Sequence, residues 1–258
     1  MFDGQFPAQA DILLILGGQG SGKNGFAVSQ VKDDVWAKMT GLIMPQNSGL
    51  IIKARAINKD DKKFLRAQGI KPHPFNHVRV FSDDGKQSRI IWKPKEYLPV
   101  SPVRVFSNFH LYGMFFAYVG MEDVIEHIDD DLMTDAWVLS DESAWLDRRF
   151  NMTVEGKEMA KFTATIRKRR LHFLQLVQYS NQIEGRYIQF STNHILCSYD
   201  KITQIVTYDQ KKDGVTSRHS FWLPYYWNNY DTTERVPTGQ YNINRALKKF
   251  HALETANV

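Results

Sequence analysis

The hydrophobic pattern of the chain consists of short apolar runs that end at glycine or at polar residues. Residues 12–16, 135–139 and 171–177 each have the length and composition of a strand that is buried on both faces of a sheet. Residues 25–39 place apolar side chains at mixed three- and four-residue spacings, which is typical of a helix packed on a sheet. The pattern predicts an α/β fold with a central, mostly parallel sheet flanked by helices.

The remaining predicted elements are shorter. We expect a hairpin around Asp84-Gly85, a charged helix over residues 59–68, and a basic helical segment over residues 143–170. Other elements are strands at residues 42–44, 49–55, 104–108, 183–190, 195–199 and 202–208, a hairpin turn at 209–214, and helices at 121–128 and 245–253. We predict a single domain over residues 1–258, with a β-rich insertion at 42–104 and an aromatic and helical C-terminal extension at 209–258.

A glycine-rich turn follows the first apolar run and fits the G-x-x-x-x-G-K start of a phosphate-binding loop. Its backbone N–H groups can surround an anion, the next helix aims its N-terminus at the same point, and Lys23 adds a mobile positive charge. The motif has Ser or Thr after the lysine, where a hydroxyl ligates Mg²⁺, and this chain has Asn24. The alternative is a glycine-rich turn without a ligand. The predicted nucleotide-binding residues are Gly17, Gly18, Gln19, Gly20, Ser21, Gly22, Lys23 and Asn24.

Two consecutive carboxylates, Asp141 and Glu142, end the apolar run that starts near residue 135. Open parallel sheets bind ligands at the carboxyl ends of their strands, so we expect this pair beside the phosphate loop. There Asp141 would hold Mg²⁺ directly or through water, and Glu142 would polarise the attacking water. Taken alone, the pair is also consistent with a solvated strand end. Together with Lys23, it predicts a nucleoside triphosphatase.

A basic segment and a polar strand end supply further candidates. Residues 161–170 end in the run Arg167-Lys168-Arg169-Arg170, for which the simplest interpretation is a solvated helix face. In the functional interpretation, one arginine reaches a γ-phosphate in its own or a neighbouring subunit, and others contact nucleic-acid phosphates. Gln178 follows a buried strand, where it either contacts the attacking water or the γ-phosphate as a sensor, or only solvates the strand end.

Composition and charge narrow the function less than the motifs do. With 43% hydrophobic and 24% charged residues, the chain has the material for a core and is not a disordered chain. A formal net charge of +5 suits an anionic partner, nucleic acid included, without proving one. Cys197 is the only cysteine, which excludes an intramolecular disulfide and a thiolate metal cage. No run approaches the ~20 apolar residues that cross a bilayer, so we expect a soluble, cytoplasmic protein.

Several landmarks occur in one order along the chain: Gly17–Asn24, residues 107–111, residues 139–149, residues 166–172, Gln178 and residues 230–232. This series resembles the HerA/FtsK-type P-loop ATPases, and among them the viral genome-packaging ATPases and the Zot-like phage assembly proteins. The resemblance covers most of residues 11–232. It implies a RecA-like sheet and a homo-oligomeric ring, a pentamer or hexamer, that moves double-stranded DNA through a central pore with ATP and Mg²⁺.

By position, the resemblance also implies roles for single residues. Lys23 would bind the β- and γ-phosphates, Asp141 and Asn24 the metal, Glu142 the water, and Gln178 would act as the sensor. The candidates for the arginine finger are Arg148, Arg149 and Arg167. Zot-like proteins usually carry a transmembrane segment after the ATPase domain. Because this sequence has none, it favours a soluble packaging motor in the host cytoplasm, or one at a capsid or portal vertex.

Two other functions stay open. One is a P-loop kinase for a small molecule, with the arginine-rich segment as a lid, although such kinases do not normally need a glutamate directly after the metal aspartate. The other is a basic DNA-binding structural protein whose nucleotide site has decayed. Asn24 would suit it, because a neutral carbonyl oxygen on a longer arm replaces the usual hydroxyl. The insertion at residues 42–104 could face DNA or a neighbouring subunit.

Overall fold

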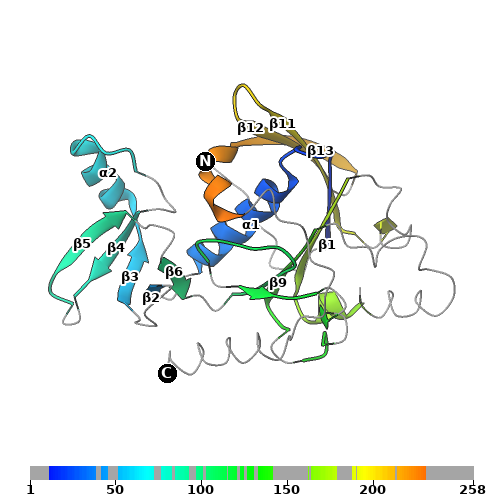
Figure 1. Cartoon of the computed structure of the whole chain (residues 1–258), viewed down its shortest axis with the longest axis horizontal. Coiled ribbons are helices and arrows are strands. Elements are labelled where there is room, and N and C mark those ends of the chain that lie inside the picture. Colours follow the sequence, from blue (N-terminus) through cyan, green and yellow to red (C-terminus); the bar gives the residue numbers. More distant parts are fainter. Residues whose placement is uncertain are drawn as a thin grey trace.

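The computed structural model describes residues 12–38, 42–45, 52–72, 77–82, 85–92, 97–100, 103–114, 116–120, 123–124, 127–130, 133–141, 162, 164–178, 188–189, 191–212 and 214–230. These residues form a large sheet of eight strands and a separate sheet of five strands (Figure 1). None of the helices in these ranges is long and apolar enough to cross a membrane.

The large sheet is mostly parallel. Its strands are β1 (Ile12–Leu16), β7 (Arg104–Ser107), β8 (Ala117–Tyr118), β9 (Ala136–Asp141), β10 (His172–Val177), β11 (Asn193–Asp200), β12 (Ile205–Lys212) and β13 (Val215–Trp222). They lie in the order β13-β12-β11-β1-β10-β9-β7-β8. Every pairing from β11 to β8 is parallel, and β12 and β13 extend the β11 edge in antiparallel fashion. The predicted α/β fold with a mostly parallel sheet is confirmed.

The strand order decides which strand ends meet. Counted from β11 towards β7, the parallel strands lie in the order β11, β1, β10, β9, β7, so β10 lies between β1 and β9. Leu16, the last residue of β1, is opposite Val177, and Leu176 is opposite Asp141. The loop after β1 and the acid that ends β9 therefore lie at the same edge of the sheet.

Central strands of this sheet are buried on both faces. Ile12 and Leu14 belong to an apolar core on one face, whereas Leu13 and Ile15 belong to a second core on the other. This alternation explains why the sequence reads as a continuous apolar run, because successive side chains of a strand point to opposite faces. Residues 162 and 164–168, which are helical, cover the first core through Phe162 and Ile166. Helices thus cover both faces.

Helix α1 (Lys23–Ala37) covers the second core and starts directly after the phosphate-loop glycines. Its apolar side chains from Phe26 to Trp36 are buried, and so is Lys32, whose Nζ donates a hydrogen bond to Asn229 Oδ1 over 2.8 Å. Asn229 ends η5 (Trp227–Asn229), a 3-10 turn that follows η4 (Leu223–Tyr225). Burial lowers the pKa of Lys32 to about 8 and raises the pKa of the neighbouring Asp33 to about 7.

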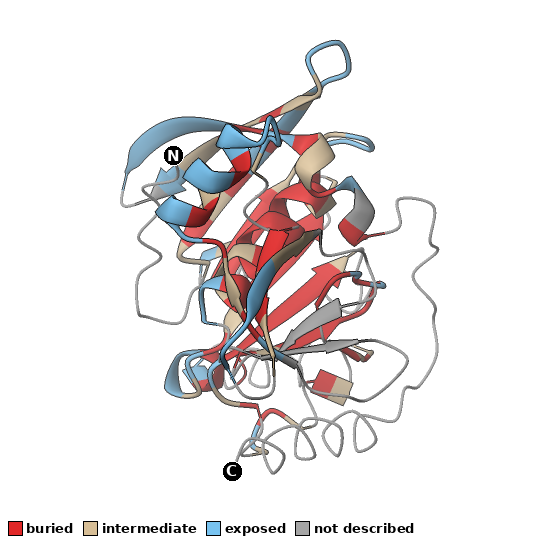
Figure 2. Cartoon of the chain, turned by 90° about the vertical axis from the view of Figure 1, so that its left-hand side faces the viewer, coloured by how far each residue is buried: buried red, intermediate tan, exposed pale blue. Residues whose placement is uncertain are grey.

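The smaller sheet is antiparallel and comes from one continuous part of the chain. It contains β2 (Leu42–Pro45), β3 (Ile52–Ala56), β4 (His77–Phe81), β5 (Ser88–Trp92) and β6 (Tyr97–Val100), in the order β5-β4-β3-β2-β6. Helix α2 (Lys59–Ala67) connects β3 to β4. This sheet and α2 lie to one side of the large sheet in Figure 1, the side that faces the viewer in Figure 2. The strands span residues 42–100, whereas residue 104 of the predicted insertion already starts β7 in the large sheet.

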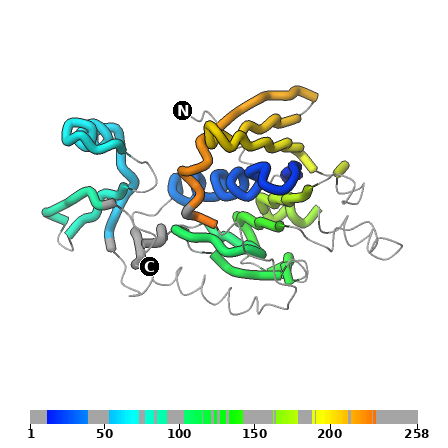
Figure 3. Tube along the Cα trace, turned by 45° about the horizontal axis from the view of Figure 1, so that its top comes forward, coloured from blue at the N-terminus to red at the C-terminus, as the bar shows by residue number. Residues whose placement is uncertain are grey.

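One end of α1 contacts the small sheet. Trp36, in the last turn of α1, is 3% exposed and packs in a small apolar core with Ala54, Val78 and Val80. Figure 3 shows the small sheet lying off the end of α1 that is remote from β1. Helix α1 therefore connects the phosphate loop at its first residue to the small sheet at its last turn.

Four predicted elements differ from the structure. Residues 188–189, inside the strand predicted at 183–190, are helical. Residues 202–204 form a turn, so that β12 starts at Ile205, and it continues to Lys212 through most of the hairpin turn predicted at 209–214. Of the helix predicted at 121–128, residues 123–124 are helical and 127–128 lie in a turn. The terminal helix predicted at 245–253 lies outside the described residues.

Candidate functional site

The glycine-rich loop lies between β1 and α1 and has the backbone that its glycines predict. Gly20 and Gly22 have φ angles of 73° and 86°, in the left-handed region that favours glycine. The N–H of Ser21 donates to the carbonyl of Gly18 over 3.2 Å, which closes a tight turn. Gly22 then caps α1, since the N–H of Phe26 donates to its carbonyl over 2.9 Å. The loop thus delivers the chain directly into the first turn of the helix.

Two of these glycines are also required by close packing. A Cβ atom on Gly17 would lie 2.8 Å from the carbonyl oxygen of Cys197 in β11. One on Gly22 would lie 2.5 Å from a methyl group of Val206 in β12. The strands β11 and β12 therefore pack closely against the loop, and this packing fixes the position of the loop relative to the sheet edge.

Lys23 is folded back onto the loop. It is 7% exposed, and its Nζ donates hydrogen bonds to the carbonyl oxygens of Gly17 over 2.6 Å and Gly18 over 3.0 Å. Nearby, burial raises the pKa of the Cys197 thiol to about 12, although the charge of Lys23 opposes this rise. The cysteine is therefore a neutral thiol at physiological pH and is no candidate nucleophile.

Asn24 and Asp141 meet across the edge of the sheet. Nδ2 of Asn24, in the first turn of α1, donates a hydrogen bond to Oδ2 of Asp141, the last residue of β9, over 2.7 Å. Both side chains are half-buried. The structure thus brings the residue that replaces the usual hydroxyl next to the residue predicted to hold the metal.

Asn108 fixes the backbone of Asp141. Its Nδ2 donates to the carbonyl oxygen of Asp141 over 2.8 Å, and its Oδ1 accepts from the N–H of Asp141 over 2.8 Å. Asn108 is 6% exposed and directly follows β7, the strand next to β9. The sequence pattern alone predicts no role for this asparagine. A sequence signal for such a role nevertheless exists, because Asn108, like Gln178, is a polar residue that directly follows an apolar run.

Gln178 lies at the same edge. It directly follows β10, between the strand that leads into the phosphate loop and the strand that ends at Asp141. Its side chain is half-buried. The position suits a group that contacts a γ-phosphate, and the sensor role itself stays a prediction.

Arg167 lies at the opposite edge. It is exposed and precedes the first residue of β10, whereas the phosphate loop lies at the carboxyl end. The neighbouring Arg169 donates to the carbonyl of Asp130, and Arg170 pairs with Asp135, so both anchor the chain near the start of β9. Because six residues of strand span about 20 Å, Arg167 does not lie beside the loop of its own subunit. Three predicted site residues lie outside the described residues: Glu142, Arg148 and Arg149.

The site fits an anion and a divalent cation. The hydroxyl of Ser21 is buried without a hydrogen-bond partner in the described structure, which leaves a polar atom of the loop unsatisfied. Asp141 offers carboxylate oxygens, and a rotated Asn24 amide would offer its carbonyl oxygen, which are the ligand types Mg²⁺ prefers. The described residues contain no group of three or more His, Cys, Asp or Glu side chains that could hold a metal ion. This is consistent with nucleotide sites, where phosphates and water supply most of the ligands of Mg²⁺.

Comparison with known proteins gives structural matches only, since no protein-family model and no curated protein matches the sequence. One match is the N-terminal domain of zonular occludens toxin from Neisseria meningitidis, with 14% identity and a TM-score of 0.48, over 86% of this chain and 100% of that one. Another is the genome packaging NTPase B204 from Sulfolobus turreted icosahedral virus 2 in complex with ATP-gammaS, with 8% identity and a TM-score of 0.39, over 82% and 96%. A third is EssC (ATPases 2 and 3) from Geobacillus thermodenitrificans, with 9% identity and a TM-score of 0.39, over 95% and 44%.

Proteins of both kinds named by the sequence resemblance are thus among the matching structures. At these identities and TM-scores the likeness carries no information on function, which must come from the residues of the site. The strand order, the loop that follows β1 and the acid that ends β9 are properties of this chain itself. The chain has an α/β fold with a mostly parallel central sheet, in which a glycine-rich loop joins β1 to α1.

Proposed function

We propose that the protein is an ATP-driven translocase of double-stranded DNA, and that it serves as the genome-packaging ATPase of a virus. The nucleotide half of this proposal rests on the site at the carboxyl edge of the large sheet. The DNA half rests on the order of landmarks that the chain shares with packaging ATPases and on its net charge of +5.

The observation that carries the proposal is the contact between Asn24 and Asp141. It places a carboxylate within one hydrogen bond, 2.7 Å, of the residue that follows the loop lysine. A glycine-rich turn without a ligand does not need a carboxylate at that point. A triphosphate site does, because the acid supports the cation that neutralises the phosphates.

Lys23 would change partners when a nucleotide binds. In the structure its ammonium group satisfies the carbonyls of Gly17 and Gly18, and an anion in the loop would compete for the same charge. Glu142 would polarise the attacking water, and Gln178, at the same strand edge, would contact the water or the γ-phosphate. Bound Mg²⁺ would neutralise phosphate charge, held by Asp141 with Asn24.

An arginine finger would come from a neighbouring subunit if it is Arg167, since this residue lies at the edge opposite its own loop. That requirement fits a ring, in which one subunit completes the site of the next. Arg148 and Arg149 remain the other candidates. A ring of five or six subunits around double-stranded DNA is the assembly we propose.

The experiment compares ATP hydrolysis with and without double-stranded DNA, using protein whose oligomeric state has been measured. We expect wild-type protein to release phosphate faster when DNA is added. Glu142→Gln should keep the thermal shift caused by ATP and lose phosphate release. Unchanged turnover in Glu142→Gln would refute the assignment of the catalytic base.

A second function is favoured by the same hydrogen bond. With Nδ2 of Asn24 bound to Asp141, the site could bind nucleotide and not hydrolyse it, as in a DNA-binding protein regulated by ATP. An ATP-dependent thermal shift without phosphate release would support this function. Transfer of phosphate to a nucleoside or metabolite would instead identify a kinase, and absence of any thermal shift would indicate a decayed site.

A further inference from the structure

The net positive charge of the chain comes from residues 42–100, which contain the small sheet and α2. Residues 42–100 contain 12 basic and 5 acidic residues, an excess of seven positive charges. The rest of the chain contains 21 basic and 23 acidic residues, an excess of two negative charges. The whole net charge of +5 thus comes from the part of the protein that forms the small sheet. Such segregation predicts an anionic partner for this part of the molecule.

Helix α2 gathers these charges on one face. Lys59, Lys62, Lys63 and Arg66 are spaced by three and four residues, so they lie next to one another along the nine-residue helix. Three of them, Lys59, Lys63 and Arg66, are exposed, and Lys62 is half-buried. We call these four residues the α2 basic face. Figure 2 shows exposed residues on the side of the molecule to which α2 belongs.

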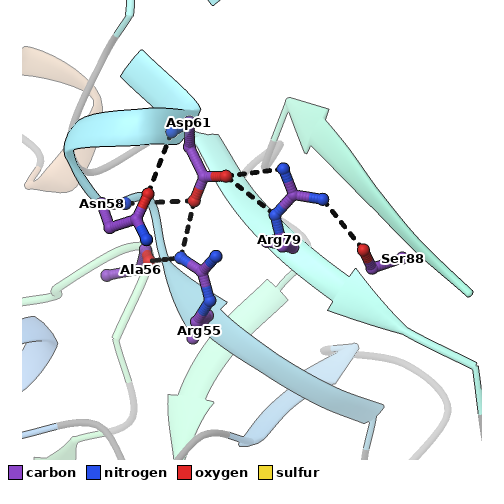
Figure 4. Close-up of polar contacts among 6 residues, drawn as sticks. All are labelled: Arg55, Ala56, Asn58, Asp61, Arg79 and Ser88. Atoms are coloured by element: carbon purple, nitrogen blue, oxygen red, sulfur yellow. Dashed lines mark hydrogen bonds and ion pairs between the residues drawn. The ribbon is translucent and has the colours of Figure 1, made fainter. Parts of the chain in front are cut away.

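The buried carboxylate of Asp61 determines which side of α2 packs on the small sheet, and hence where the basic face points. Asp61 is 2% exposed and accepts hydrogen bonds from Arg79 of β4, at 2.6 and 2.8 Å, and from Arg55 of β3, at 2.6 Å (Figure 4). It also accepts from the N–H of Asn58, whose side chain caps α2 in return. Although desolvation alone would raise the pKa of Asp61, these bonds hold it below its ordinary value. Asp61 thereby attaches one side of α2 to the sheet and leaves the basic face outward.

The α2 basic face forms no ion pair in the described part of the chain, although the exposed Asp60 lies beside it in the helix. None of its four residues forms an ion pair or a side-chain hydrogen bond there. Like charges three or four residues apart destabilise a helix by about 0.2–0.5 kcal/mol for each pair. The face contains four such pairs, because each of Lys59 and Arg66 neighbours both Lys62 and Lys63. A bound anion would relieve this repulsion.

We propose that the α2 basic face binds the phosphate backbone of double-stranded DNA. The proposal deepens the proposed function, on which the choice of DNA as the partner rests. Lysine side chains on long, flexible arms neutralise phosphates without reading sequence, which suits a protein that must move along any DNA. Each neutralised phosphate contributes about 0.9 to the dependence of log K on log salt for B-form DNA.

Other partners fit the face less well. Phe64 is 52% exposed and is the single exposed aromatic residue described in α2, and it does not lie among the four basic residues. Single-stranded nucleic acid needs several aromatic rings for stacking. Protein interfaces are depleted of lysine and need apolar anchors, and membrane-surface helices need an apolar face as well. In α2 the apolar Leu65 is buried against the sheet.

The test measures binding of a labelled DNA duplex of about 30 base pairs at several salt concentrations, without nucleotide. The variant carries Lys59→Gln, Lys63→Gln and Arg66→Gln, which keep good helix formers. The control carries Lys201→Gln, Lys211→Gln and Arg218→Gln, which remove two lysines and one arginine that are exposed in β12, in β13 and in the turn after β11; of these, Arg218 pairs with Asp209. We expect the α2 variant to bind at least about tenfold more weakly and its salt slope to fall by about one unit for each lost contact. The control should stay close to wild type.

Two further measurements separate the possible results. The α2 variant should melt at the same temperature as wild type or slightly higher, because repulsion is relieved, and it should hydrolyse ATP without DNA at the wild-type rate. An α2 variant that binds DNA with unchanged affinity and slope would overturn the assignment of this surface and leave the proposed ATPase intact. Failure of the ATPase would instead appear as wild-type protein that releases no phosphate. Equal binding of wild type to poly-L-glutamate or to phosphatidylserine vesicles would also overturn the choice of DNA.

Discussion

Asn24 Nδ2 donates a hydrogen bond to Asp141 Oδ2 over 2.7 Å, and this contact joins the first turn of α1 to the end of β9. In the usual motif, a Mg²⁺ ion lies between the hydroxyl and the acid. In this structure, the amide of Asn24 contacts the carboxylate of Asp141 directly. To share a cation with Asp141, Asn24 must turn its amide so that Oδ1 replaces Nδ2. This rotation breaks the hydrogen bond between Asn24 and Asp141, a free-energy cost that a serine or threonine at residue 24 would not have.

Replacing Asn24 by serine should therefore increase hydrolysis. The serine hydroxyl is the usual Mg²⁺ ligand at this position and does not compete with the cation for Asp141. We expect Asn24→Ser to lower the Mg²⁺ concentration for half-maximal ATP hydrolysis and to raise kcat by about two- to tenfold. Asn24→Ala, which offers no ligand, should lower the rate about tenfold. Equal Mg²⁺ dependence in all three proteins would show that residue 24 does not touch the metal.

Removing the side chain of Asn108 should displace Asp141. Asn108→Ala leaves the N–H and the carbonyl of Asp141 without their partner, at a cost of about 1–3 kcal/mol in unfolding free energy. We expect hydrolysis to fall while the thermal shift caused by ATP persists, because the phosphate loop is untouched. Asn108→Asp keeps the acceptor, but its second carboxylate oxygen faces the carbonyl oxygen of Asp141 and repels it, so its rate should be no higher than that of Asn108→Ala. A wild-type rate in Asn108→Ala would argue against this positioning role.

The glycines of the loop should differ sharply in tolerance. Gly22→Ala combines a φ of 86° with a Cβ 2.5 Å from Val206, so it should destabilise the protein by about 2–4 kcal/mol and abolish the ATP-induced thermal shift. Gly18→Ala is the matched control, since no atom lies within 4 Å of its Cβ. Adding Val206→Ala to Gly22→Ala should restore part of the stability, because it removes the clash and not the strain. Urea denaturation of the four proteins measures these differences.

The pH dependence of stability should contain a contribution from Asp33. Burial raises the pKa of Asp33 to about 7, against the charge of Lys32 and a hydrogen bond from Tyr226. The folded protein then keeps a proton that the unfolded chain releases above about pH 4. The contribution of protonated Asp33 to the unfolding free energy is therefore complete below about pH 4 and is lost as the pH rises through about 7. Each unit of pKa shift corresponds to about 1.4 kcal/mol.

The variant Asp33→Asn lacks this titration. Between about pH 5 and pH 7.5 the unfolding free energy of wild type should therefore fall relative to that of Asp33→Asn. The upper limit avoids the titration of Lys32, whose pKa burial lowers to about 8. Urea unfolding of both proteins at the two pH values gives the comparison. Parallel pH profiles would mean that Asp33 is ionised in the folded protein.

The sequence predicts much of the site because local patterns determine it. The glycines and Lys23 define the loop without reference to other segments, and Asp141 is placed by the rule that parallel strands bring their carboxyl ends together. Asn108 was missed as a functional residue because its role depends on pairing between β7 and β9. That pairing joins segments about 30 residues apart and leaves no periodic signal.

The same distinction explains the failures in the fold. Near residue 188 a short apolar run has no period that separates strand from helix, and the described residues there are helical. The sequence left open whether Arg167 serves its own or a neighbouring subunit, and its place at the edge opposite its own glycine-rich loop follows from the direction of β10, which a basic run does not encode. The contact of Trp36 with the small sheet is likewise set by tertiary packing.

That contact gives α1 the geometry of a lever. Its 15 residues make a rod about 22 Å long, with the phosphate loop at one end and Trp36 fixed in the apolar core of the small sheet at the other. If a closing loop tilted this rod by about 10°, its far end would move by about 4 Å. A tilt of α1 that starts at the glycine-rich loop would therefore be transmitted through Trp36 to the small sheet.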